Sequence, residues 1–387
     1  MNKIYLDNAS TSFPKPKQVV GAMCSFMEQK GYNINRGGYE GAYESAQIVY
    51  ETREKLCRLF DFSEIRNVIF TLNVTQSLNM ILQGLLQKGD HIIVSAMEHN
   101  AVMRPVIQLE KKGIEFQRFP CTEDGSLMVS EMESCLRPNT KAVVITAASN
   151  VCGTTMPLAL VGEFCKKNKL IFIVDAAQSA GVEEISMEKM QIDILAFTGH
   201  KSLLGPQGVG GFLIREEIVP LIPSIITGGT GSFSDQEETP IIMPDKYEAG
   251  TMNLPGIYGL HAALSFLEEV GVSKIKEREM KRTKEFLDGI DKIPGIRVIG
   301  KKGVEGRTAV VSIQSDFCDE ATLAFRLDQE YGIMTRVGLH CAPNAHKTLG
   351  TFPRGTVRFS FGYFTTAMEI EAAIDAIQEI CQSETSI

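Results

Sequence analysis

Short apolar runs alternate with longer helical stretches along the middle of the chain, from about residue 67 to residue 214. A short run rich in β-branched residues is typical of a buried strand, whereas apolar residues spaced three or four apart are typical of a helix. This alternation predicts a mainly parallel sheet with helices on both faces. The predicted strands cover residues 68–71, 91–95, 115–119, 142–146, 170–174, 192–196 and 209–214.

The two flanks of this region have different patterns. Residues 2–15 run into the sequence SFPKP at 12–16, and its prolines predict an extended arm with no helix before about residue 17. Helical spacing occurs at 19–29, 43–60, 257–270, 274–287, 322–331 and 367–381. We interpret the highly charged 274–287 segment as a helix that forms a solvated face. We expect a large domain over residues 16–255 and a smaller α+β domain over residues 256–387. The arm 1–15 is expected to belong to the smaller domain.

Composition and charge exclude several classes of protein. The 387 residues are 44% hydrophobic with a net charge of −8, so no basic surface is expected that would bind nucleic acid or an anionic membrane. No apolar run approaches the roughly 20 residues that span a bilayer, and the amino terminus lacks a signal-peptide core, so we expect a cytoplasmic protein. The nine cysteines include no CxxC pair, which argues against a disulfide framework and against a metal site.

Two polar residues follow predicted buried strands. Asp175 follows the run 170–174, and Lys201 lies shortly after the run 192–196. The carboxyl edge of a parallel sheet is where ligands bind, so both side chains are expected in one crevice. Taken singly, Asp175 is more simply a helix cap and Lys201 a surface lysine in a glycine-rich turn. Taken together, they supply what pyridoxal phosphate needs, a lysine that binds it covalently and an acid opposite its ring nitrogen.

The motifs around these residues resemble those of a known family. VDAAQSAG at 174–181 and TGHKSLLGPQGVG at 198–210 are similar to the cofactor motifs of the class V aminotransferases. This group of fold-type I pyridoxal-phosphate enzymes includes cysteine desulfurases and selenocysteine lyases. Similar motifs extend from LDNAST at 6–11 to RFSFGYF at 358–364. The resemblance implies the α/β fold of fold-type I enzymes, a mainly parallel seven-stranded sheet in the large domain, and pyridoxal 5'-phosphate as the cofactor.

The resemblance also assigns roles to individual residues. Thr75 begins a predicted helix, where free N–H groups suit a phosphate, although it is equally an ordinary helix cap. His99, in an MEH motif, would stack on the pyridine ring with a pKa suited to proton transfer, although a lone histidine there is more simply structural. The implied cofactor contacts are Val74, Thr75, Thr198 and His200 at the phosphate, Asn150 and Gln178 near the phenolic oxygen, Asp175 at the ring nitrogen, His99 and Lys201.

Two loops are expected to lie at the edge of the site. Residues 226–245 have many turn residues and little periodicity, which favours a functional or intersubunit loop. The following YEAGTMN resembles a family motif whose threonine reaches the phosphate held by the other subunit, so Thr251 implies a homodimer. The polar loop 33–38 fits a flexible loop and an active-site loop equally well. In the resembling family this region lies near the substrate entrance, which makes Asn33 a candidate substrate contact.

The stretch TRVGLHCAPNAH at 335–346 resembles the RxGxHC motif of the cysteine desulfurases. Cys341 has glycine, proline and asparagine as neighbours, a context that favours a loop thiol able to act as a nucleophile. Arg358 is expected to bind the substrate carboxylate with a bidentate guanidinium. Arg336 is a second candidate, equally well explained as a surface arginine.

The resemblance therefore implies conversion of L-cysteine to L-alanine, with Lys201, Cys341 and His99 as catalytic residues and a sulfur-acceptor protein as a partner. Many members of this subgroup carry a second histidine where this chain has Leu339. That departure leaves room for a selenocysteine lyase or a cysteine or cystine C–S lyase. A class V aminotransferase and a non-catalytic sensor that binds pyridoxal phosphate are further alternatives.

Overall fold

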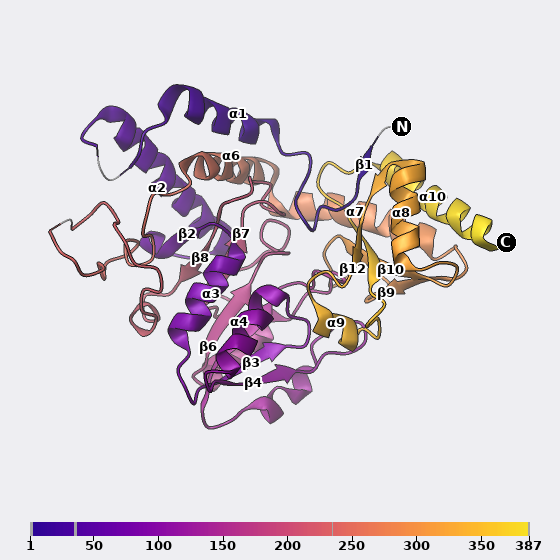
Figure 1. The fold of residues 1–387 in the computed structure, drawn as a ribbon, viewed down its shortest axis with the longest axis horizontal. Helices are drawn as coiled ribbons and strands as arrows, with labels where there is room; N and C mark the ends of the chain where they lie inside the picture. Colours follow the sequence, from indigo (N-terminus) through magenta and orange to yellow (C-terminus); the bar gives the residue numbers. More distant parts are fainter. Residues whose placement is uncertain (1–2, 35–36, 234, 386–387) are drawn as a thin grey trace.

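The computed structural model describes residues 3–34, 37–233 and 235–385. Figure 1 shows a large domain built around a seven-stranded sheet and a smaller domain, formed mostly by the carboxyl-terminal third, around a four-stranded sheet. The α/β architecture expected from the sequence is confirmed. The boundary between residues 255 and 256 stays a prediction.

The large sheet contains all of the predicted strands, and each predicted strand end lies within two residues of the observed one. The strand order is β2-β8-β7-β6-β5-β3-β4, and within this sheet of the described chain only β8 runs against the others. The strands are β2 (Val68–Thr71), β3 (His91–Ser95), β4 (Glu115–Phe119), β5 (Thr140–Thr146), β6 (Ile171–Asp175), β7 (Ile194–Thr198) and β8 (Gly210–Ile214).

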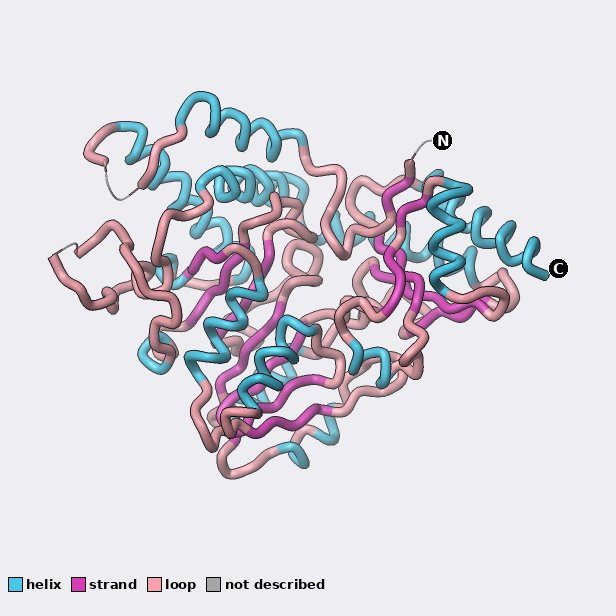
Figure 2. The backbone as a smooth tube through the Cα atoms, viewed as in Figure 1, coloured by secondary structure: helices cyan, strands magenta, loops and turns pink. Residues whose placement is uncertain are grey.

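Helices flank the sheets of both domains, as the tube in Figure 2 shows. The segment after α1 continues as a π-helical stretch, Phe26–Lys30. The α-helices are α1 (Lys17–Ser25), α2 (Glu40–Phe60), α3 (Val74–Leu85), α4 (Asn100–Glu110), α5 (Leu158–Lys167), α6 (Leu254–Val270), α7 (Val272–Ile290), α8 (Glu320–Tyr331), α9 (Pro343–Thr348) and α10 (Ala367–Thr385).

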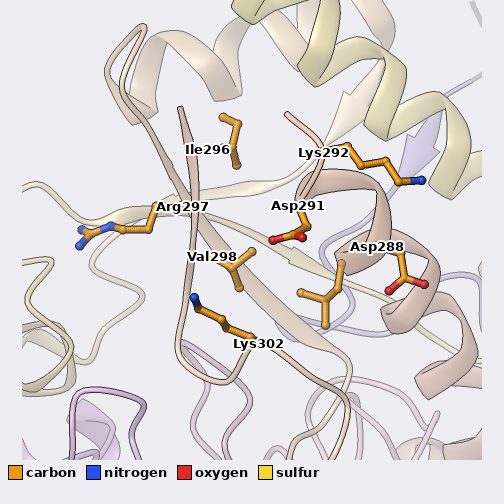
Figure 3. A pocket seen from close by; sticks show the side chains of 8 residues that line it. Asp288, Asp291, Lys292, Ile296, Arg297, Val298 and Lys302 are labelled. Atoms are coloured by element: carbon orange, nitrogen blue, oxygen red, sulfur yellow. The ribbon is translucent and has the colours of Figure 1, made fainter. Parts of the chain in front are cut away.

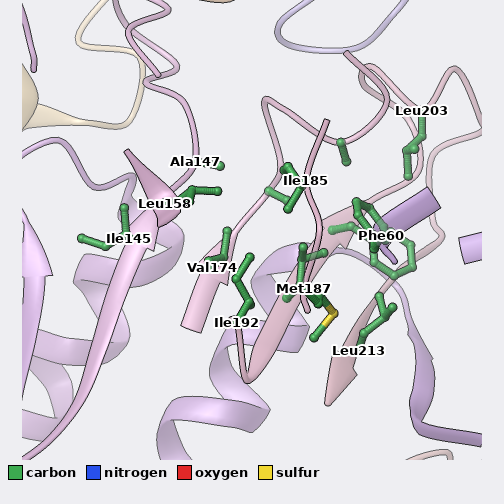
Figure 4. Close-up of a cluster of buried hydrophobic side chains, with 14 of the residues drawn as sticks. Phe60, Ile145, Ala147, Leu158, Val174, Ile185, Met187, Ile192, Leu203 and Leu213 are labelled. Carbon is green, nitrogen blue, oxygen red and sulfur yellow. The ribbon is translucent and has the colours of Figure 1, made fainter. Parts of the chain in front are cut away.

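Both faces of the large sheet are covered, which explains why its inner strands are largely apolar, whereas the edge strand β4 is partly exposed and carries polar residues. Successive side chains of a strand point to opposite faces. In β5, Val143 and Ile145 join the core under α2, α5 and α6, whereas Ala142 and Val144 join the core under α3 and α4. Figure 4 shows the first of these cores around Phe60 and Ile145. The carboxyl ends of the parallel strands are therefore held rigidly between two layers of helices.

The amino-terminal arm packs against the smaller domain. β1 (Ile4–Tyr5) pairs in parallel with β11 (Ile333–Met334), and Leu6 is buried in the core of this domain. Its antiparallel sheet has the order β12 (Arg336–Gly338), β13 (Thr356–Ser360), β10 (Val310–Ser315) and β9 (Ile296–Ile299). The arm then continues toward the large domain, where Ser12 N donates to His200 O at 3.0 Å. The arm thus connects the smaller domain to the Lys201 segment.

Helix α7 has a buried side in addition to the solvated face expected from the sequence. The charged segment 274–287 lies in α7, and this helix buries Ile275, Phe286 and Ile290 on one face. It also buries Glu279, and burial raises the pKa of that carboxyl to about 8. Its charged residues obscured a buried stripe, so α7 is amphipathic and not solvated all round.

Two further observations concern ligands and membranes. Among the described residues, no helix is long and apolar enough to cross a bilayer, and no cluster of acidic, histidine and cysteine side chains is arranged to hold a metal ion. A cavity of about 680 Å³ lies between α7 and β9, where Asp288, Asp291, Lys292 and Arg297 mix both signs of charge (Figure 3). None of the residues proposed from the sequence as site residues lines this cavity.

Candidate active site

Asp175 and Lys201 lie at the expected edge of the sheet. Asp175 is the last residue of β6 and is buried, with Oδ1 accepting from Ala177 N at 2.9 Å. Burial raises the pKa of Asp175, while the Ala177 N–H and the charge of Lys201 partly oppose that rise. Burial lowers the pKa of Lys201 to about 8 against the opposing charge of Asp175. The carboxylate and the amine therefore share one desolvated crevice.

Two buried polar atoms beside Lys201 have no hydrogen-bond partner in the described part of the chain. They are Thr198 Oγ1, at the end of β7, and His200 Nδ1. An unpaired buried polar atom is unfavourable unless a ligand completes it. Burial, with the charges of Lys201 and Lys15, lowers the pKa of His200 to about 4 and keeps its ring neutral. Both residues are thus available to a ligand, and their role at a phosphate stays a prediction.

The amino terminus of α3 differs in detail from the prediction. Asn73, and not Thr75, caps this helix, because Asn73 Oδ1 accepts from Gln76 N at 3.0 Å. Val74 is buried and begins the helix, while Thr75 is exposed in its first turn. The hydroxyl of Thr75 is therefore not needed for capping and remains available to an anion at the helix terminus.

His99 caps α4 and lies at the same crevice. Its Nδ1 accepts from Ala101 N at 3.0 Å, so the proton of the neutral ring is on Nε2. Burial, followed by the charges of Lys201, Arg336 and other cations, lowers the pKa of His99 to about 4. The expectation of a pKa near neutrality is therefore wrong for this environment. His99 is a neutral hydrogen-bond donor at pH 7.

The two amide side chains are partly committed to the backbone. Asn150 Nδ2 donates to His340 O at 2.7 Å, and Gln178 Nε2 donates to Ala9 O at 3.0 Å. Each amide carries a second N–H, so each can still donate to a ligand oxygen. The bond from Asn150 also fixes the backbone of the loop that carries Cys341.

Arg358 lies in β13 and is fully buried. Its Nη2 donates to Asp7 Oδ1 at 2.7 Å and to Ser10 Oγ at 2.9 Å, and its Nη1 donates to Asn150 O at 3.0 Å. Its Nε has no partner among the described residues. A guanidinium with one open N–H and one bound carboxylate is arranged to bind a carboxylate.

Cys341 lies exposed on the loop between β12 and α9. His340 and Cys341 both adopt left-handed backbone angles, with φ of 48° and 58°. Such angles are unfavourable by about 1–2 kcal/mol per non-glycine residue, so surrounding bonds must hold them. His340 Nε2 lies 2.8 Å from Thr356 Oγ1, and Asn100 N donates to Cys341 O at 2.8 Å. The loop is therefore fixed with its thiol exposed.

Arg336 belongs to this site and is more than a surface arginine. Its Nη2 lies 3.5 Å from Cys341 Sγ, and its Nη1 donates to Ser10 Oγ at 3.1 Å. Its charge also lowers the pKa of Lys201 and of His99. Arg336 thus connects the thiol to the lysine crevice, a role that the sequence pattern left undecided.

Two other predicted residues lie outside this cluster or are only partly described. Thr251 is exposed, in a segment between β8 and α6. Asn33 is half-buried in the loop before α2, where its Oδ1 accepts from Ile34 N at 2.9 Å. Residues 35–36 of the predicted 33–38 loop lie outside the described residues. A single chain therefore does not bring Asn33 or Thr251 into hydrogen-bond contact with Lys201.

Sequence reasoning missed several residues that shape the site. Asp7, within the LDNAST motif, pairs with Arg358. Lys15 Nζ donates to His200 O at 2.7 Å, which anchors the peptide before Lys201. Glu98 is buried beside His99 and accepts from Thr146 N at 2.8 Å. The signal available for Glu98 was its charge shortly after a buried strand, the same kind of signal that identified Asp175.

Comparison with known proteins gives consistent matches over nearly the whole chain. A sequence model of the aminotransferase class-V family matches residues 4–373. The chain is 32% identical to a probable cysteine desulfurase of Pyrococcus abyssi, covering 98% of this chain and 94% of that protein. It is 31% identical to a probable cysteine desulfurase of Methanothermobacter thermautotrophicus, covering 97% and 94%.

Solved structures agree with these matches. The apo structure of a cysteine desulfurase from Thermococcus onnurineus NA1 has a TM-score of 0.92 at 31% identity, covering 98% of this chain and 95% of that chain. A cysteine desulfurase from Escherichia coli has a TM-score of 0.88 at 27% identity, again covering 98% and 95%.

The fold, with a lysine and a carboxylate at the sheet edge, defines a fold-type I enzyme that depends on pyridoxal phosphate. More specifically, the chain belongs to the class V aminotransferase family. The side chains present fit the cofactor. Thr198 Oγ1 and His200 Nδ1 are unpaired donors or acceptors for a phosphate, and Lys201 and Asp175 are the amine and acid that the cofactor requires.

Proposed function

We propose that this chain is a cysteine desulfurase that releases L-alanine from L-cysteine and retains the sulfur as a persulfide on Cys341. One observation carries the proposal: the exposed thiol of Cys341 lies 3.5 Å from a guanidinium whose charge also acts on Lys201. An exposed thiol with a guanidinium beside it is placed to act as a nucleophile. The chain therefore has a nucleophile at the crevice where the substrate would be held, which a transaminase or a sensor would not need.

Pyridoxal phosphate, when bound, supplies an electron sink that weakens bonds at the α-carbon and at the β-carbon to sulfur. Lys201 would hold it covalently and Asp175 would face its ring nitrogen. Thr198 and His200 would hold its phosphate, together with the amino terminus of α3.

Arg358 would orient the substrate through its carboxylate. Asp7 is a carboxylate already bound to Nη2, so it stands in for the substrate group in the resting protein. An incoming carboxylate would use Nη2 and the free Nε in a bidentate pair. Displacement of Asp7 would leave Ser10 Oγ and Asn150 O as fixed partners of the guanidinium.

Lys201 and His99 would move the protons. The pKa of Lys201, lowered to about 8, leaves an appreciable neutral fraction at neutral pH, so this amine can accept the α-proton. His99 has its proton on Nε2 and is neutral, so it would donate a hydrogen bond without adding a charge. Both residues are half-buried, which limits the competition from water.

Cys341 would carry out the sulfur transfer. Its thiolate attacks the sulfur of the substrate and forms an S–S bond while the Cβ–S bond breaks. The electron pair of that bond remains on the β-carbon, which takes a proton and becomes the methyl group of alanine. The thiolate is regenerated only when the sulfur passes to an acceptor thiol.

A homodimer, a sulfur-acceptor protein and a cytoplasmic location belong to the same proposal. In the loop before Thr251, Ile241 is 84% exposed and its neighbour Ile242 is 48% exposed. Two adjacent exposed apolar side chains support the burial of this loop against a second subunit. On that arrangement Thr251 would reach the partner's phosphate site. All nine cysteines are free thiols, as expected in a reducing compartment.

The direct experiment measures alanine and sulfide formed from L-cysteine by the purified protein with dithiothreitol as the sulfur acceptor. We expect equal amounts of the two products and an intermediate persulfide. Formation of pyruvate and ammonia, or transfer of the amino group to an oxo acid, would refute the proposal.

Leu339, which replaces a second histidine before the thiol, favours one further candidate, a selenocysteine lyase. A selenol is ionised at neutral pH and needs less local assistance than a thiol. The same assay with selenocysteine separates the two, because a lyase would release selenide quickly and turn over cysteine poorly.

A further inference from the structure

A cleft of about 330 Å³ lies between α4 and α9, directly behind the loop of Cys341. Glu98, Asn100 and Met103 contribute to its lining, and Pro343 and Asn344 contribute the opposite wall. Its charged residues are mostly basic: Arg104, Lys111, Arg118 and Lys347. We call the cleft that carries these four basic residues the cationic cleft.

The cationic cleft is unusual in a chain with a net charge of −8. Within the described residues, none of its four cations forms an ion pair, whereas many other lysines and arginines of the surface do. Burial lowers the pKa of Arg118, and the negative charge of Glu110 partly opposes that shift. Burial raises the pKa of Glu98 to about 8, so the carboxyl at the floor is mostly neutral at pH 7. The cleft therefore has a net positive charge.

Hydrogen bonds to the backbone join the walls of this cleft to the reactive thiol. Asn100 N, at the start of α4, donates to Cys341 O at 2.8 Å, and Asn344 Nδ2 donates to Ala96 O at 2.7 Å. Pro343, the first residue of α9, follows Cys341 by two residues. Anything bound in the cleft is therefore held beside the exposed sulfur.

We propose that the cationic cleft docks an acidic segment of the thiol protein that accepts sulfur from Cys341. This inference rests on the proposed desulfurase function. Arg104 and Lys111 lie seven positions apart on α4 and the turn that follows it, which corresponds to roughly 10 Å. The positive charge is therefore spread over a length along which an extended acidic peptide could bind. The volume is at the low end for a small-molecule site, whereas a few acidic side chains would fit.

Docking would serve a balanced exchange of thiols. The acceptor thiolate attacks the outer sulfur of the Cys341 persulfide and forms a new S–S bond, and the bond to Cys341 Sγ breaks. The acceptor is released as a persulfide, and Cys341 is again a thiolate. No external oxidant or reductant is needed.

The test uses two synthetic thiol peptides as acceptors, a cysteine followed by four glutamates and a cysteine followed by four glutamines. We expect the acidic peptide to remove sulfur from the persulfide form of the whole enzyme faster, with a rate that falls as salt is added. The double variant Lys111→Gln/Lys347→Gln should lower the acidic-peptide rate by roughly three- to tenfold, the sum of two exposed charge contacts. The rate with the glutamine peptide should stay unchanged.

A matched control removes the same charge elsewhere. Lys112 and Lys189 are exposed and lie outside the cleft, so Lys112→Gln/Lys189→Gln should retain the preference for the acidic peptide. Equal rates for the two peptides, or equal losses in both double variants, would overturn the docking proposal. Stronger competition by a single-stranded oligonucleotide than by the acidic peptide would overturn it as well. Failure of the desulfurase function itself would look different. No persulfide would then form on Cys341, and no sulfide would be released in the assay with dithiothreitol.

Discussion

Replacing Asp7 with asparagine should destabilise the resting protein. It should also increase the gain in thermal stability that a bound substrate gives. Asp7 is the carboxylate partner of Arg358, with Nη2 and Oδ1 separated by 2.7 Å. The arginine side chain is only 1% exposed and that of Asp7 is 19% exposed. Removal of one partner of a buried ion pair leaves an uncompensated charge and destabilises by roughly 3–5 kcal/mol. Because Asp7 keeps some contact with water, we expect the lower end, about 3 kcal/mol.

Thermal unfolding measures this loss. An unfolding entropy of about 2.1 cal/mol/K per residue, applied to 387 residues, corresponds to about 0.8 kcal/mol per degree, so Tm should fall by about 4 °C. L-cysteine or a non-reactive carboxylate analogue should restore more stability in Asp7→Asn than in the native protein, because its carboxylate replaces the missing charge. Asp375 is exposed on α10, and Asp375→Asn is the matched control. A Tm shift below about 1 °C in Asp7→Asn, or an equal shift in the control, would refute this account of Arg358.

The remaining predictions concern the cofactor, the dimer and pH. Borohydride reduction of the yellow protein should fix the cofactor on Lys201, and Lys201→Ala should abolish that label; a label on another lysine would contradict the assignment. Mixing inactive Lys201→Ala with an inactive Thr251→Ala chain should restore part of the activity if sites are shared, whereas an active monomer would exclude sharing. His99, His200 and His346 have a pKa of about 4 when folded and 6.5 ordinarily, so the unfolded chain binds protons first. Glu98 and Glu279, with a pKa raised to about 8, contribute in the opposite direction, so the test compares His346→Gln with the native protein. As pH is lowered from 6.5 toward 4, the urea midpoint should fall by less in the variant than in the native protein, and equal falls would contradict the burial of this ring.

The sheet was predictable because its physical signal is local. Strands buried on both faces are largely apolar, and the predicted runs of this kind are strands of the large sheet, whose edge strand β4 is more polar and partly exposed. Asp175 was predictable for the same reason, because a carboxylate directly after such a run lies at the ligand-binding edge of the sheet. The buried side of the charged helix α7 was missed because its apolar positions, such as Ile275 and Phe286, are separated by many lysines and glutamates.

The contacts that shape the site were not predictable, because they join distant parts of the chain. Asp7 and Arg358 are 351 positions apart, and no local pattern pairs them. The lowered pKa of His99 depends on burial and on cations from other segments, most of which its own motif does not reveal. Arg336 is a site residue only because the fold places its Nη2 near Cys341.

The central claim is that Cys341 accepts the sulfur of cysteine. The most direct measurement compares Cys341→Ala with the native protein, using intact mass to detect the persulfide and quantifying alanine formed from L-cysteine. We predict that the variant binds pyridoxal phosphate and changes its absorbance with cysteine, because Lys201, Asp175 and Arg358 remain. It should carry no persulfide and lose alanine formation by orders of magnitude. Alanine production by Cys341→Ala at the native rate would contradict the proposed mechanism and make a lyase the better account.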